Sequence, residues 1–192
     1  MTDESIKRYE EYAYVLDYLP YGQLRQFQPF YKREPILQAI GEYYFTLLEL
    51  VPLPGMDFSI GERIAIGKHE RTKIAHVKRR ITYEELTQTA KEELENVIGI
   101  IVSKNEERFV AFFNTAGPIT TRMHSLELLP GIGKKLMWQI IEERKKAPFS
   151  SFEDIQKRLH ILDPKKMIVK RIIMELKNED KYYIFTKPYI SK

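Results

Sequence analysis

The hydrophobic pattern of this 192-residue chain changes its period near Thr82, and that change limits the fold more than any other feature. Before Thr82, short runs rich in aromatic and β-branched residues lie between prolines and glycines, which is typical of strands. After Thr82, apolar residues recur at helical intervals. We therefore predict an α+β protein with β-structure in the N-terminal part and helices in the C-terminal part.

The first 82 residues are predicted to form a small β-barrel domain. Its strands are expected at Tyr12–Leu19, Tyr43–Val51, Gly61–Gly67 and Lys73–Ile81, with a short helix near Ile36–Ile40. Short strands in a segment of this length suit a small barrel better than an open sheet.

Residues 83–118 are predicted to be a helical connector. Thr82 and Glu85 have the spacing of a capping box, and a second helix is expected at Asn105–Ala116. Residues 119–192 then form a domain of short helices with an aromatic and basic tail. The buried face of the first connector helix is predicted to contain Leu86, Ala90, Leu94, Val97 and Ile101, and the later helices are predicted at Thr121–Leu129, Lys134–Lys146, Phe152–Arg158 and Lys165–Lys177.

The turn between the first two of these later helices contains Gly131, Ile132 and Gly133, followed by Lys134 and Lys135. Glycine permits a tight turn, and its missing Cβ lets a bulky partner approach the backbone. The first amides of a helix lack intrahelical acceptors and lie at the positive end of the helix dipole, so a phosphate can bind there. Such a contact reads the backbone of a nucleic acid and not its base sequence.

These residues resemble the helix-hairpin-helix family of nucleic-acid binders. The segment from Leu129 to Lys135 matches the family's pattern of a hydrophobic residue, Gly, a hydrophobic residue and Gly, although Met137 stands where alanine is usual. The stretch from Ala147 to Ile155 resembles the link to a second hairpin in tandem members. In the second copy, from Leu162 to Lys165, both glycines are missing, so we interpret it as structural, with Lys165 and Lys166 as helpers.

Most of the chain also resembles an archaeal uncharacterised family catalogued as domain of unknown function 655. The resembling stretches are Tyr14–Tyr18, Phe45–Pro52, Gly61–Lys68, Val77–Leu86 and Pro118 through Ile155. The resemblance implies an oligonucleotide-binding-like (OB-like) barrel joined to a tandem helix-hairpin-helix unit, with RNA as the commonly supposed ligand.

Other residues are candidates for contact with a nucleic acid. Alternation along Lys73–Ile81 places His76, Lys78 and Arg80 on one face of a strand, where they can follow a phosphate backbone or simply be solvated. Arg122 precedes the glycine turn and can approach the same phosphate. Trp138 is predicted to pack against the barrel or the connector in preference to stacking on a base. Three tyrosines are likewise interpreted as core in preference to base-stacking residues: Tyr12, Tyr14 and Tyr18.

The charge distribution agrees with a polyanionic partner. Residues 60–82 carry seven basic and two acidic side chains, and residues 120–192 carry sixteen and nine, whereas the remaining segments are acidic. The absence of cysteine excludes disulfides, thiolate metal sites and a cysteine nucleophile. The histidines lack metal-ligand spacing, so neither a metal nor a cofactor is expected. The polar N-terminus and the absence of long apolar runs predict a cytoplasmic protein that is not membrane-bound.

The sequence thus predicts a non-enzymatic, largely sequence-independent nucleic-acid-binding protein, with RNA favoured over DNA. The hairpin also resembles that of some base-excision glycosylases, and this resemblance implies one alternative: a DNA glycosylase or abasic-site lyase in which Lys135 forms a Schiff base assisted by Asp154. Two features argue against this enzyme. The N-terminal part is predicted to be β-structure, where such glycosylases have a long helical domain, and the chain lacks the cysteines that bind the iron–sulfur cluster of many of them. Another alternative is an adaptor with a protein partner in the ribosome or the transcription machinery.

Overall fold

The computed structural model describes residues 9–22, 34–68, 70–160 and 163–188. The chain divides into two compact units, here called the first unit (1–97 with 185–192) and the second unit (98–184). The boundary between them falls within helix α1, Gln88–Lys104.

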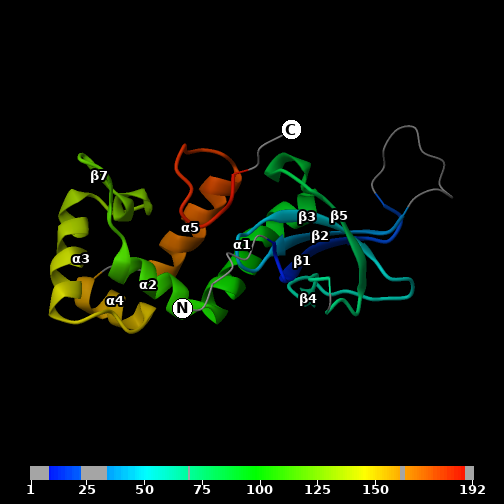
Figure 1. Ribbon diagram of the computed structural model, residues 1–192, viewed down its shortest axis with the longest axis horizontal. Helices are drawn as coiled ribbons and strands as arrows, with labels where there is room; N and C mark the ends of the chain where they lie inside the picture. Colours follow the sequence, from blue (N-terminus) through cyan, green and yellow to red (C-terminus); the bar gives the residue numbers. More distant parts are fainter. Residues whose placement is uncertain (1–8, 23–33, 69, 161–162, 189–192) are drawn as a thin grey trace, which may run out of the picture. The chain divides into compact units, whose positions relative to one another are not determined.

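The first unit contains a curled five-stranded antiparallel sheet in the order β4-β1-β2-β3-β5 (Figure 1). In the described part of the chain, pairing stops at β4 and β5, so the sheet is a half-barrel and the predicted closed barrel is not reached. The strands are β1 Tyr12–Leu19, β2 Ile36–Gly41, β3 Leu47–Pro52, β4 Arg63–Ala65 and β5 Ile74–Arg80.

The predicted helix at Ile36–Ile40 is wrong, because this segment is strand β2. All of its residues are buried, and it pairs with β1 on one side and β3 on the other. A strand covered on both faces reads as a continuous apolar run, which periodicity does not distinguish from a short buried helix. The other four predicted strands are confirmed, and β1 begins and ends at the predicted residues.

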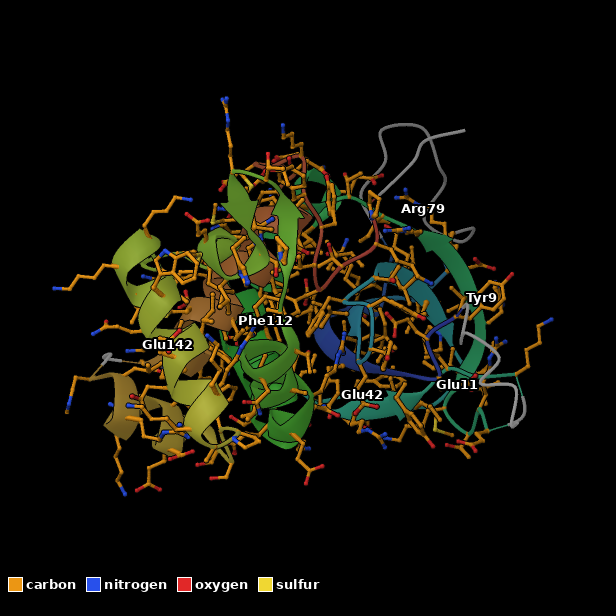
Figure 2. The ribbon with its side chains drawn as sticks, turned by 60° about the vertical axis from the view of Figure 1, so that its left-hand side comes forward. Tyr9, Glu11, Glu42, Arg79, Phe112 and Glu142 are labelled. Atoms are coloured by element: carbon orange, nitrogen blue, oxygen red, sulfur yellow. The ribbon has the colours of Figure 1, made fainter. Side chains whose placement is uncertain are left out.

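One face of the sheet carries the apolar core, which includes Val15, Leu37, Leu50, Ile64 and Ile74 from all five strands. The opposite face carries a row of polar residues in register across β1, β2, β3 and β5. This row consists of Asp17, Gln38, Glu49 and Arg79 (Arg79 is labelled in Figure 2).

The polar row holds the segment that leads into α1. Gln38 donates to the Glu85 carbonyl at 3.0 Å and accepts from the Thr87 amide at 2.8 Å. The Thr87 hydroxyl donates to Asp17 at 2.6 Å and accepts from the Ala90 amide at 3.0 Å, so it caps the helix. The predicted capping box at Thr82 is present but opens a short 3₁₀ helix, η2 Tyr83–Glu85, and α1 begins only after Thr87.

The predicted buried face of the connector is confirmed, since Leu86, Ala90, Leu94, Val97 and Ile101 are all at most 5% exposed. The remaining elements belong to the second unit: α2 Glu106–Thr115, β6 Pro118–Thr120, β7 Met123–His124, η3 Ser125–Leu128, α3 Lys134–Lys146, α4 Phe152–Leu159 and α5 Pro164–Leu176. Among the described residues, no helix has the length and apolar character needed to cross a bilayer.

Helix α3 has the predicted bounds, but the predicted helix at Thr121–Leu129 is wrong. This segment contains β7, which pairs with the preceding β6 in a small β-hairpin, and then the 3₁₀ helix η3. The Gly117 carbonyl accepts from both the amide and the hydroxyl of Ser125, at 2.9 and 2.7 Å, and these bonds close the hairpin. Local β-pairing therefore prevails over the helical spacing of the apolar residues.

Candidate nucleic-acid interface

The turn that precedes α3 is tight. The Ile132 amide donates to the Leu129 carbonyl at 3.0 Å, and the Ile132 side chain, 5% exposed, anchors the turn in the core. Gly131 has φ +93°, a conformation that side-chain-bearing residues rarely adopt. Gly133 is the N-cap of α3 and has an extended backbone, so its conformation does not require glycine.

The two glycines therefore have different roles. A Cβ at Gly131 would lie 3.5 Å from Met167 Cε, an ordinary contact, so the constraint there is the backbone angle. A Cβ at Gly133 would meet no heavy atom within 4 Å. Both glycines are exposed, and no side chain of the described residues caps the first amides of α3. We call residues 131–135 the hairpin entrance.

The two lysines at the hairpin entrance differ in their contacts. Lys134 Nζ donates to the Arg122 carbonyl at 2.9 Å and to the Glu127 carboxylate at 3.2 Å. Lys135 is exposed and has no charged or hydrogen-bonding side-chain partner among the described residues. Lys135 thus presents a cation that can move toward an anion. Arg122 is exposed as well, and its backbone carbonyl accepts from Lys134.

Glu127 is a member of the site that sequence reasoning missed. Its carboxylate accepts from the His124 amide at 2.9 Å, while His124 Nδ1 accepts from the Leu126 amide at 3.1 Å, so the pair forms a capping box for η3. The His124 amide and then Lys134 lower the pKa of Glu127. Burial, followed by the positive charge of Arg144, lowers the pKa of His124. The capping box was not recognised because histidine is an unusual N-cap residue.

A buried arginine beneath the turn was also missed. Arg171 on α5 is 1% exposed and donates to Glu175 at 2.9 Å, to Asp180 at 2.8 Å, to the Leu128 carbonyl at 3.2 Å and to the Tyr182 carbonyl. The Leu128 contact links this network to the residue that precedes the turn. No local sequence signal distinguishes a buried arginine from a solvated one on a helix with a basic face.

The second hairpin has a different entrance. Its N-cap is Asp163, as predicted, and the Asp163 carboxylate accepts from the Lys166 amide at 3.1 Å. Lys166 Nζ lies 4.0 Å from the same carboxylate, and the Lys165 side chain would be 3.7 Å from a Cβ at Gly99 of α1. A negative side chain thus occupies the position that is open at Gly133. Leu162 lies outside the described residues.

The basic strand β5 does not present one continuous row. Two irregularities in its pairing with β3 place His76 opposite Val51 and Arg80 opposite Leu48. Leu48 and Val51 are three residues apart on β3, so their side chains lie on opposite faces of the sheet. Paired residues share a face, so His76 and Arg80 also lie on opposite faces. Arg80 donates to the Lys187 carbonyl, and Lys78 Nζ is 3.7 Å from Glu34. His76 is exposed.

The aromatic candidates are divided between core and surface. Tyr14 is fully buried. Tyr18 packs on the apolar core, on the other face of the sheet from Tyr14, because a bulge between Val15 and Asp17 reverses the alternation of side chains along β1. Tyr12 lies beneath Arg63, whose guanidinium is 3.6 Å from the ring centroid. Trp138 was predicted to be packed but is 59% exposed. No group of three or more metal-ligating side chains occurs within the described residues.

Comparison with known proteins identifies the family. The chain is 52% identical over 183 residues to an uncharacterised protein of Methanocaldococcus jannaschii, MJ0038, covering 94% of this chain and 82% of that protein. It is also similar to the crystal structure of Af1531 from Archaeoglobus fulgidus, with 53% identity, a TM-score of 0.86, and coverage of 93% of this chain and 100% of the other. The model of the family described as "Protein of unknown function (DUF655)" matches residues 9–187. The chain therefore belongs to the DUF655 family.

Proposed function

We propose that the protein binds the sugar–phosphate backbone of a nucleic acid through the hairpin entrance, without catalysis and largely without regard to base sequence. The observation that carries this proposal is the open N-terminus of α3: the N-cap is a glycine with free space at its Cβ position, and Lys135 is exposed beside it. Unpartnered helix amides and a mobile ammonium group together fit an oxyanion.

The internal comparison with the second hairpin supports this assignment. At Asp163 the corresponding N-cap carboxylate accepts from a helix amide and repels an anion, so that copy is suited to packing and not to phosphate binding. We propose RNA as the preferred ligand, as the family resemblance implies, with DNA as the comparison to be measured.

The abasic-site lyase alternative gains no support from Asp154, the carboxylate that it requires. Asp154 accepts from the Ser150 amide at 3.0 Å and lies 3.3 Å from the Arg158 guanidinium. These contacts lower the pKa of Asp154, the amide contribution being the larger. Asp154 lies in the first turn of α4, where a carboxylate stabilises the N-terminus of the helix, and this structural role explains its presence.

The test uses the second hairpin as a template. In Gly133→Asp, the N-cap of α3 receives the carboxylate that α5 already has, and the extended backbone at Gly133 accepts Asp without strain. The variant should fold at least as stably as the parent, because Asp is a good N-cap. Binding of a short single-stranded or structured RNA, measured by fluorescence anisotropy, should fall at least tenfold, since an anion now faces the phosphate.

Salt dependence separates the lysines. Lys135→Ala should reduce the slope of log K against log salt by about one unit, because each phosphate contact releases condensed counterions. Lys134→Ala should reduce it less, because Lys134 already neutralises Glu127. Lys170→Ala is the matched control, an exposed lysine in the middle of α5, beyond the first turn of that helix. Equal slopes for all four proteins, or RNA binding unaffected by Gly133→Asp, would refute the proposal.

A further inference from the structure

Trp138 is an unusual residue for an exposed helix surface. It is the chain's sole tryptophan, and it is the one large hydrophobic side chain that is exposed in the described part of the second unit. Its 59% exposure leaves much of a large apolar ring in water, which is unfavourable unless a ligand covers it.

Trp138 lies close to the hairpin entrance. It follows Lys134 by four residues and Lys135 by three, and residues at these spacings are neighbours on a helix surface. Helical side chains in general lean toward the helix N-terminus, which places the surface covered by a residue at this position on the side of the open amides of α3. The axial distance from Gly133 to Trp138 is about 7.5 Å at the normal helical rise, so the two positions lie little more than one turn apart.

The surrounding side chains are also suited to a nucleotide. Gln139 is exposed, follows Lys135 by four residues, and can donate to or accept from a base edge. The first turn of α3 contains no acidic residue. The next acidic residue on the exposed side, Glu142 (labelled on α3 in Figure 2), lies a turn beyond Trp138 and is paired with Lys145 at 2.8 Å. Four residues thus form one patch, here called the stacking patch: Lys134, Lys135, Trp138 and Gln139.

We infer that Trp138 stacks on an unpaired base of the strand whose phosphate binds at the hairpin entrance. This inference rests on the proposed function and adds a preference to it: the ligand must offer a single-stranded segment, a bulge or a frayed end. In a regular duplex the neighbouring base pairs cover both faces of each base, so a backbone contact remains but the indole has no base to stack on.

Tryptophan emission, excited at a wavelength that tyrosine does not absorb, reports on this residue alone, because the protein has no other tryptophan. Three probes separate the contributions: a short single-stranded oligouridylate, a blunt RNA duplex of the same length, and inorganic polyphosphate, which has charge but no bases. We expect the oligouridylate to quench the tryptophan emission strongly at saturation, and the duplex and polyphosphate to bind with little quenching. Iodide should quench the free protein and lose access once the oligouridylate is bound.

Affinity of variants gives the second readout. Trp138→Ala should lower the ratio of oligouridylate affinity to polyphosphate affinity by about 5- to 150-fold, the range for stacking of one base, and Trp138→Phe should restore part of it. Tyr9→Ala is the matched control, since Tyr9 is an 80% exposed aromatic residue in the first unit, and its ratio should equal that of the parent. Thermal melting checks that each variant is folded.

The outcomes distinguish the two proposals. If the three probes all bind but none quenches the tryptophan, or if Trp138→Ala leaves the affinity ratio unchanged, the stacking inference is refuted while backbone binding stands. If none of the probes binds, the proposed function itself fails. If a protein partner quenches Trp138 and no oligonucleotide does, the exposed indole belongs to a protein interface and the inference is overturned.

Discussion

Replacement of Arg171 by Ala should destabilise the second unit severely. The Arg171 side chain is 1% exposed, and its ion-pair partner Glu175 is fully buried. In the variant, Glu175 retains the hydrogen bond from the Ile184 amide at 2.9 Å but loses the Arg171 guanidinium, so the removal of one partner breaks a buried ion pair. The carbonyls of Leu128 and Tyr182 also lose their guanidinium donor.

The magnitude follows from these contacts. Breaking a buried ion pair by removing one partner costs about 3–5 kcal/mol, and leaving buried carbonyls without a donor adds to the upper part of that range. Asp180 is 27% exposed in its side chain, so its lost contact contributes little. We therefore expect a decrease of about 3–5 kcal/mol in the free energy of unfolding of the second unit.

Urea denaturation followed by circular dichroism at the helical band measures this decrease. The double variant Arg171→Met with Glu175→Leu is the control, because it removes both charges and should recover much of the loss. A decrease below about 1 kcal/mol for Arg171→Ala would show that water reaches the network, and the assignment of a buried ion pair would then be wrong.

Three further predictions concern other parts of the molecule. Burial and then Arg144 lower the pKa of His124 below its ordinary 6.5, so the unfolded chain protonates this imidazole at a higher pH than the folded protein does. The melting temperature should therefore fall as the pH drops below about 6.5. His124→Asn, which keeps an N-cap residue, should remove this part of the pH dependence. Gly41→Ala should cost about 1–3 kcal/mol in a denaturant titration, because its Cβ would lie 2.1 Å from the Glu10 carboxyl and displace it from three backbone amides. Asp163→Gly should open the second hairpin and increase the salt slope of RNA binding by up to about one unit, with only a few tenths of a kcal/mol lost from stability.

Local signals in the sequence were sufficient to predict most elements. The α+β class, four of the five strands, α3 with its bounds and the buried face of α1 follow from periodicity and capping residues. The errors occurred where pairing with residues outside the segment decides its structure. Strand β2 is defined by its two neighbours, and the β6–β7 hairpin is closed by hydrogen bonds to Gly117.

The residues of the candidate site were predictable only in part. The glycines and lysines of the hairpin entrance could be named because they are contiguous in the sequence. Whether Lys134 is available to a ligand depends on its hydrogen bond to Glu127, which the capping box of η3 holds in place. Similarly, alternation placed His76 and Arg80 on one face, and the two irregularities that separate them arise from pairing with β3. Sequence patterns locate charged residues, whereas their availability is set by tertiary contacts.

The contrast between the two hairpins gives a physical criterion for a phosphate-binding copy. Both entrances begin a helix of thirteen residues whose N-cap has an extended backbone. A pair of lysines follows the N-cap directly in α3 and after one proline in α5, so charge and backbone geometry alone do not distinguish the two entrances. They differ at the N-cap side chain: glycine leaves the first amides of α3 open, and Asp163 occupies those of α5. Aspartate stabilises the helix it caps by the same hydrogen bond that excludes an external anion. An N-cap glycine instead gives up that stabilisation, and this loss is understandable if a phosphate replaces the missing cap.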